Sequence, residues 1–296
     1  MEKAKVYFTK EITPESLIKM YEVLNHKLGG KVAVKLHSGE DGNQNYLRPD
    51  FMKALVERVN GTVVECNTAY PGARTNNEDH RKLLHKHEWD KYYNVDLMDE
   101  DGEIELEVKN GKVLKHNYVG SHIKDYDSML VLSHFKGHPM GGFGGAIKQL
   151  SIGCASRKGK AFIHGAGTTH DAETVWNNLP KQEEFLESMA DAASSVVELF
   201  KGNIVYINVM KNMSVDCDCC ADAEDPCIKD IGILSSLDPI AIDQACIDLV
   251  YASEDKGKFH LLERINSRNG LHTLEAAHEL GFGNRNYELI NVDEKE

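Results

Sequence analysis

The chain has 296 residues, of which 41% are hydrophobic and 27% are charged, a balance typical of a folded globular protein and unlike that of a disordered or fibrous chain. Its 34 basic and 47 acidic residues give a formal net charge of −13, which repels phosphate backbones, so we expect no nucleic-acid partner. No apolar run approaches the ~18 residues of a membrane span, and the first ten residues alternate charged and apolar side chains. We therefore expect a cytoplasmic protein with no membrane partner.

The first 66 residues alternate short apolar strands with amphipathic helices. We expect strands at 6–8, 32–36 and 63–66, and helices that begin at Pro14 and at Pro49. Thr13 is placed to cap the first of these helices, and Pro14 to occupy its first position. This strand–helix rhythm predicts an α/β fold with a central, mostly parallel sheet flanked by helices.

Residues 103–119 change to a hairpin pattern, in which alternating Glu and apolar residues precede Asn110-Gly111 and a second alternating run follows. Asn-Gly favours a type I′ turn, so we expect an antiparallel β-hairpin inserted near 95–120, beside the main sheet. Farther along, we expect strands at 129–132, 204–209 and near 289, and helices at 183–200, from Asp238-Pro239 onward, and at 274–280 with Thr273 as its cap. Because no repeat or long linker interrupts the chain, we expect a single α/β domain over 1–296.

Three polar residues around the second strand are candidates for binding an anion. Lys35 and His37 are two apart, so on a strand they share one face, at the carboxyl end where open α/β sheets place ligands. Arg48 follows shortly afterwards. The alternative is a solvated strand end whose glycine and asparagine residues only form a turn.

A glycine-rich segment follows the strand expected at 129–132, and five of the nine residues at 137–145 are glycine. Backbone N–H groups of such a loop can approach an anion closely, and neighbouring cations can neutralise its charge. The spacing matches neither the Walker nor the Rossmann pattern, so it identifies no nucleotide. The candidate anion- or cofactor-binding residues here are Gly142, Gly144, Gly145, Lys148 and Arg157.

Histidines of this region are candidates for proton transfer. His138 lies two residues from Lys136, and a neighbouring cation or burial would lower its pKa and favour neutral imidazole. We expect His138, Lys136 and His37 to be the catalytic residues. His164 and His170 flank a glycine-containing segment and belong to the same candidate cleft, where one of them would serve only backbone carbonyls.

Four of the seven cysteines, Cys217, Cys219, Cys220 and Cys227, lie within eleven residues. This clustering fits a reducing compartment and a soft-metal site better than a disulfide framework. The spacing C-x-C-C-x₆-C matches neither the zinc-ribbon nor the ferredoxin pattern. Three interpretations of the segment therefore remain open: the four cysteines bind an iron–sulfur cluster or zinc, two of them form a redox pair of thiols, or the segment is an inert loop. Cys154 is a further candidate nucleophile.

Several sequence blocks together resemble the domain-of-unknown-function family numbered 362. They include Val-Lys-Leu-His-Ser-Gly-Glu at 34–40, Ser-His-Phe-Lys-Gly-His at 133–138, Gly-Phe-Gly-Gly-Ala-Ile-Lys at 142–148, Gly-Cys-Ala-Ser-Arg at 153–157 and Asp-Ile-Gly-Ile-Leu at 230–234. Proteins of this family are often described as iron–sulfur or ferredoxin-like, and many carry a two-cluster ferredoxin insertion after the Gly-Cys-Ala-Ser block. Here residues 158–180 contain no cysteine. The resemblance therefore implies that any metal is held by the cysteines at 217–227.

Together these features predict a metal- or iron–sulfur-binding enzyme, with oxidoreductase chemistry as one possibility, that acts on a small anionic molecule. In this hypothesis Lys35, His37, Lys136 and Lys148 hold the anion while His138 exchanges a proton. The alternative is a non-catalytic iron–sulfur electron carrier or metal-binding module with a redox partner protein. The hypothesis requires these five residues, counting His138, to meet in one hollow at the rim of the sheet.

Overall fold

The computed structural model describes residues 3–294, and its centre is an eight-stranded sheet with the strand order β12-β1-β11-β10-β7-β2-β3-β4. These strands are β1 Ala4–Thr9, β2 Val32–Lys35, β3 Gly61–Glu65, β4 Asp96–Leu97, β7 Ser128–His134, β10 Ile204–Met210, β11 Gly232–Ser236 and β12 Tyr287–Asn291. Only β11 runs antiparallel to its neighbours, β1 and β10; the other pairs are parallel. The predicted α/β class with a mostly parallel sheet is confirmed.

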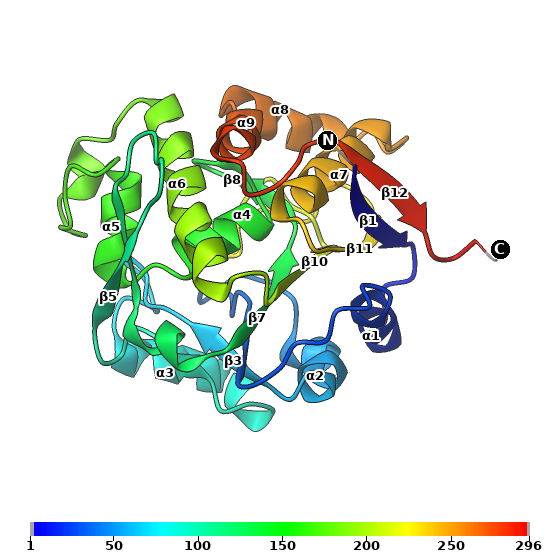
Figure 1. Ribbon diagram of the computed structural model, residues 1–296, viewed down its shortest axis with the longest axis horizontal. Helices are drawn as coiled ribbons and strands as arrows, with labels where there is room; N and C mark the ends of the chain where they lie inside the picture. Colours follow the sequence, from blue (N-terminus) through cyan, green and yellow to red (C-terminus); the bar gives the residue numbers. More distant parts are fainter. Residues whose placement is uncertain (1–2, 295–296) are drawn as a thin grey trace.

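Helices cover both faces of this sheet, as Figure 1 shows. They are α1 Pro14–Glu22, α2 Pro49–Arg58, α3 Asn77–Lys86, α4 Ala146–Lys148, α5 Arg157–His164, α6 Gln182–Phe200, α7 Pro239–Ala252, α8 Lys258–Ser267 and α9 Leu271–Leu280. Helices α1 and α2 lie on one face, and α4, α6, α7 and α9 lie on the other. Within residues 3–294 no helix has the length and apolarity needed to cross a membrane.

The central strand β7 illustrates why this sheet is apolar on both faces. Met129 and Val131 pack on the side of α6 and α7, whereas Leu130 and Leu132 pack on the side of α1 and α2. Successive residues of a strand point to opposite faces, so a strand covered on both sides requires an uninterrupted apolar run.

Local capping signals were mostly reliable. The Thr13 hydroxyl accepts the Ser16 N–H at the start of α1, and the Asp238 carboxylate accepts two N–H groups at the start of α7, so both predicted caps are confirmed. The predicted Thr273 cap is wrong, because α9 begins earlier, at Leu271. There the Thr273 N–H bonds to the Gly270 carbonyl and is already part of the helix.

The predicted hairpin is present as a separate two-stranded antiparallel sheet, β5 Glu103–Glu107 with β6 His116–Gly120. Its predicted two-residue Asn-Gly turn is wrong, because the connection spans 108–115 and only Asn110, at φ 58°, takes the left-handed conformation that a type I′ turn needs at both positions. The reason is a long-range contact. The Asp191 carboxylate, on α6, accepts the backbone N–H groups of residues 112–114 at 2.7–2.9 Å.

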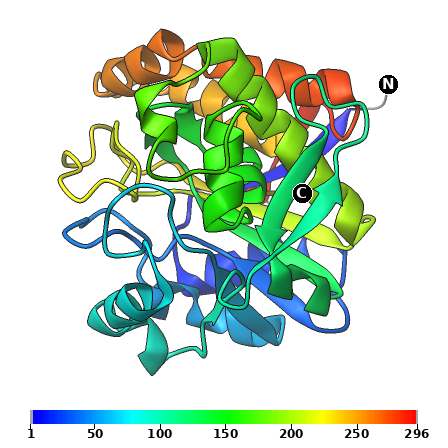
Figure 2. The same ribbon diagram turned by 90° about the vertical axis from the view of Figure 1, so that its left-hand side faces the viewer.

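Four adjacent parallel strands, β3, β2, β7 and β10, end at one edge of the sheet. The loops that follow them lie side by side along this edge, as the blue, cyan and yellow segments of Figure 2 show. Backbone contacts join the loops: the Glu40 N–H donates to the Asp218 carbonyl, and the Asn45 side chain donates to the Glu224 carbonyl, each at 2.8 Å. The polar segments that the chain spreads over nearly 200 residues therefore meet at one place.

Candidate functional site

A cavity of about 300 Å³ opens at this carboxyl edge of the sheet. Open α/β sheets place their ligands at this edge, because loops from several strands converge there. Lys35, His37, Lys136, His138 and Lys148 all line the cavity, so the structure brings together the five residues that the sequence hypothesis required to meet. Gly144, Gly145, Cys219 and Cys220 line it as well.

Two of these lysines are already paired with buried carboxylates. Lys35 Nζ lies 2.6 Å from the Glu65 carboxylate, and Lys136 Nζ lies 2.8 Å from the Asp218 carboxylate, which His134 also contacts at 2.9 Å. Burial disfavours ionised carboxylates, yet these cations hold the pKa of Glu65 and of Asp218 well below the usual range. Lys35 and Lys136 therefore help to fix the architecture of the pocket, and most of their charge is neutralised within the protein.

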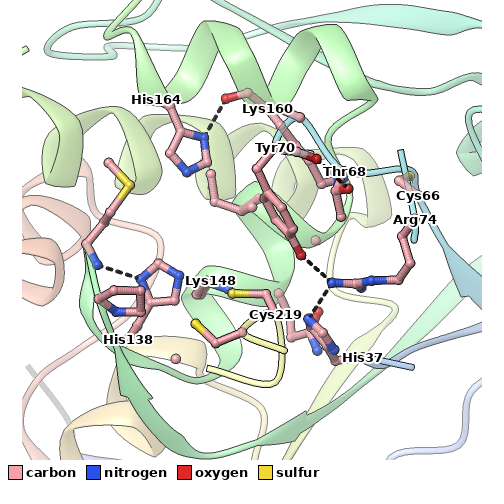
Figure 3. A pocket seen from close by; sticks show the side chains of 18 of the residues that line it. His37, Cys66, Thr68, Tyr70, Arg74, His138, Lys148, Lys160, His164 and Cys219 are labelled. Atoms are coloured by element: carbon pink, nitrogen blue, oxygen red, sulfur yellow. Dashed lines mark hydrogen bonds between the residues drawn. The ribbon is translucent and has the colours of Figure 1, made fainter. Parts of the chain in front are cut away.

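Arg74, which the sequence interpretation missed, is a third buried cation of the pocket. Its guanidinium contacts Glu40 at 3.3 Å, Glu65 at 3.6 Å and the Tyr70 hydroxyl at 2.6 Å. It also lies 3.4 Å from His37 Nε2, an arrangement visible in Figure 3. Burial first, and then the Arg74 charge, lowers the pKa of His37 to about 4, so His37 is neutral at pH 7. No local motif marks Arg74, because its carboxylate partners lie elsewhere in the chain, Glu40 in the loop after β2 and Glu65 at the end of β3.

Lys148 and Lys160 differ from the other cations of the pocket. Among residues 3–294 neither ammonium forms an ion pair with a carboxylate. Lys160 Nζ donates to the Ala155 carbonyl at 2.6 Å, and burial lowers the pKa of Lys160. These two lysines therefore supply positive charge that the surrounding carboxylates do not pair with directly.

The cysteine segment follows β10 and brings sulfur to the wall of the cavity. Potential ligand atoms of His138, Cys217 and Cys219 all lie within 4.8 Å of one another. Lys148 Nζ lies 3.6 Å from Cys217 Sγ. Burial opposes ionisation of Cys217, but hydrogen bonding from Cys219 and the charges of Lys148 and Lys136 hold the pKa of Cys217 well below its usual value.

His138 has a defined orientation in this group. Its Nδ1 accepts backbone N–H groups from Gly141 at 2.8 Å and from Met140 at 3.2 Å. Nδ1 therefore carries the lone pair, and the ring proton of neutral His138 lies on Nε2, the nitrogen left for Cys217. Burial, followed by the charge of Lys148, lowers the pKa of His138 to about 4, which confirms the prediction of neutral imidazole.

Other residues named from the sequence lie outside the cavity. Arg48 is exposed and lies over the Tyr46 ring at 4.0 Å, and Arg157 pairs with Glu173 at the start of α5. Cys227 Sγ faces the Met213 carbonyl at 3.5 Å and is not part of the group formed by His138, Cys217 and Cys219.

Gly142 and Cys154, the other two residues predicted from the sequence to belong to the site, have structural roles instead. Gly142 does not line the cavity; it is the first residue of β9 Gly142–Gly144, directly after the turn from β8 Lys136–His138, and its φ of 80° favours glycine. Cys154 is fully buried, and burial raises the pKa of its thiol to about 11. A thiol in these surroundings is protonated at pH 7 and is poorly suited to act as a nucleophile.

Lys160 and His164 are further pocket residues to which the sequence interpretation gave no specific role. The sequence signal that could have identified them is their i,i+4 spacing on α5, since this spacing places both side chains on one face of a helix. That helix was not predicted from the sequence, so the signal could not be used.

The fold and the pocket define an open α/β protein with a buried, cation-rich site at the carboxyl edge of its sheet. Residues 32–248 match the family model described as "Domain of unknown function (DUF362)", and the chain belongs to this family. The comparison with curated proteins gives no match.

Two solved structures resemble the chain at low sequence identity. One is the lactate racemase apoprotein from Thermoanaerobacterium thermosaccharolyticum, with 12% identity and a TM-score of 0.40, over 69% of this chain and 50% of that one. The other is a protein from Thermotoga maritima, with 11% identity and a TM-score of 0.43, over 90% of this chain and 58% of that one. The chain thus spans half the length of the first protein and 58% of the length of the second.

Proposed function

We propose that the pocket is the active site of an enzyme that holds one sulfur-preferring metal ion on Cys217 and Cys219 and binds a small anionic molecule through Lys148 and Lys160. The observation that carries this proposal is the meeting of two cysteine sulfurs and an imidazole within 4.8 Å, beside a cavity that Cys219 and His138 line. Lys148 and Lys160 line the same cavity and have no carboxylate partner among residues 3–294.

The donor set suits a zinc-class ion. Around tetrahedral zinc, neighbouring ligand atoms lie about 3.7 Å apart, so donors already within 4.8 Å need only small movements. Cys227 lies outside the group, which favours a single ion over a four-cysteine cluster. When bound, such an ion would polarise an oxygen atom of the ligand.

We assign the two sulfurs as ligands and His138 as a hydrogen-bond donor to sulfur. The backbone N–H groups of Met140 and Gly141 occupy the lone pair of its Nδ1, so the proton resides on Nε2. A metal ion at Nε2 would have to displace that proton and leave a costly imidazolate. The remaining metal positions are then open to the cavity and to the anionic molecule.

The apolar part of the cavity lining indicates the chemical character of this molecule. Ala69, Met140, Ile152 and Trp176 line the cavity along with the charged residues. Binding sites of this kind combine apolar walls with a few polar groups that fix orientation. The preferred ligand therefore carries an anionic group and a small apolar part.

Metal analysis of anaerobically purified protein tests the proposal. We expect about one zinc-class ion per chain in the wild type, and loss of this ion in Cys217→Ser and in Cys219→Ser. Cys227→Ser is the matched control, from the same segment but outside the group, and should keep the ion. A wild-type protein without metal, or equal metal content in all three variants, would refute the proposal. Iron with acid-labile sulfide that is also lost in Cys227→Ser would instead support a cluster.

A further inference from the structure

His164 has a ring orientation that leaves one nitrogen free to act as a base. Its Nδ1 lies 2.7 Å from the backbone carbonyl oxygen of Lys160. A carbonyl can only accept a hydrogen bond, so Nδ1 must carry the ring proton. The lone pair of neutral His164 is consequently on Nε2.

Aromatic packing holds this ring in place. The Phe185 ring stacks on His164 with centroids 5.2 Å apart and an interplanar angle of 22°. Trp176, which also lines the cavity, lies 5.1 Å away at 59°. With its Nδ1 hydrogen-bonded and its ring in contact with two aromatic side chains, His164 has little freedom to turn. Figure 3 shows Nδ1 directed to Lys160 and the rest of the ring turned toward the pocket.

The surroundings keep His164 neutral and place cations beside it. Burial is the main reason that the pKa of His164 falls to about 3, and the charges of Lys148 and Lys160 lower it further. These are also the two pocket lysines for which the described part of the chain offers no carboxylate partner. A bound anion would offset the charges of these lysines and raise the pKa of His164 toward the operating pH, as a general base requires. The same lysines would then stabilise the negative charge that develops on the substrate.

We propose that His164 Nε2 is the catalytic base of this pocket and removes a proton from the carbon next to the carboxylate of a small carboxylic acid. The proton passes to Nε2, which becomes imidazolium, and the C–H electron pair stays on the substrate as an enolate that Lys148 and Lys160 stabilise. Return of the proton to carbon restores neutral His164. This inference rests on the proposed anion-binding function and adds the substrate class and the reacting group.

The first test is ¹⁵N NMR of histidine-labelled protein at pH 7. We expect His164 to be neutral, with a protonated Nδ1 and an unprotonated Nε2. Its signals are assigned by their absence in His164→Asn, whose amide can still donate to the Lys160 carbonyl, or in His164→Gln if the Asn variant does not fold. An Nε2-protonated or cationic His164 would overturn the inference.

The second test is exchange of substrate hydrogen with solvent. Metal-loaded protein in D₂O is incubated with a set of small 2-hydroxy and 2-amino carboxylic acids, and ¹H NMR follows the proton on the carbon next to the carboxylate. We expect wild type to exchange this proton in at least one acid, and His164→Asn to do so roughly 10²–10⁴-fold more slowly. His170→Asn is the control, because His170 is an exposed histidine that does not line the cavity.

No exchange by wild type, or equal exchange by wild type and His164→Asn, would overturn the role of His164. Neither result affects the metal analysis of the cysteine variants, so failure of this inference remains distinguishable from failure of the proposed metal site.

Discussion

The Lys148 ammonium lies 3.6 Å from the sulfur of Cys217, on which it acts as a hydrogen-bond donor. This contact joins the end of α4, which follows the glycine-rich hairpin, to the cysteine segment after β10. One cation thus faces both the sulfur group and the cavity. The anion-binding and metal-binding halves of the proposed site are therefore electrostatically connected.

Removing either Lys148 or Lys160, which have no carboxylate partner among the described residues, should weaken anion binding. We expect acetate or inorganic phosphate to raise the Tm of the wild-type protein, since a ligand that binds only the folded state stabilises it. Lys148→Met and Lys160→Met should each lower the affinity about 10-fold, the effect of losing one charged hydrogen bond. Lys158→Met, an exposed lysine on the same helix as Lys160, is the control and should behave as wild type. Equal ligand-induced shifts in all variants would exclude these roles.

If His138 only donates a hydrogen bond to sulfur, its substitution should affect metal content less than substitution of either cysteine. His138→Gln should keep bound metal, because the Gln amide can still donate a hydrogen bond while Cys217 and Cys219 remain. Elemental analysis should give His138→Gln at least half of the wild-type metal content, in contrast to Cys217→Ser. Complete loss of metal from His138→Gln would show instead that the imidazole is a ligand.

The buried ion pair of Glu65 with Lys35 should matter far more for stability than an exposed pair. Glu65→Gln leaves the Lys35 ammonium buried without its carboxylate partner, and breaking such a pair costs about 3–5 kcal/mol. Glu57→Gln removes an exposed pair with Lys53 and should cost less than about 1 kcal/mol. Urea unfolding at pH 7 measures both, and similar losses would contradict this view of the Glu65 carboxylate.

Glu65 should also contribute to the acid sensitivity of the fold. The charges of Lys35 and Arg74 keep its pKa lowered against the effect of burial, so the folded state binds its proton less readily than the unfolded state. The resulting stability is present above the unfolded pKa of about 4.3 and is lost as the pH falls toward the folded value. Between pH 6 and pH 3.5, the free energy of unfolding should therefore fall more steeply in wild type than in Glu65→Gln. Parallel pH profiles would count against this linkage.

The sequence by itself determined the class of the fold and the region of the site. The apolar runs of β7 and β10 predict strands buried on both faces, and Thr13 and Asp238 cap their helices through bonds that span only two or three residues. The position of His37 and Lys148 after strands also predicted their meeting, because parallel strands end at a shared edge. These signals are local, or follow from a general rule of topology.

Only the tertiary structure decided which of the charged residues remain available to a ligand. Lys35 and Lys148 look equivalent in sequence, but Glu65 neutralises the first and no described carboxylate pairs with the second. Asp191 likewise binds the N–H groups of residues 112–114, and the two-residue turn that the sequence Asn110-Gly111 favours does not form. In each case the deciding partner lies tens of residues away, and a buried charge or N–H group takes the partner that folding brings to it, which no local spacing encodes.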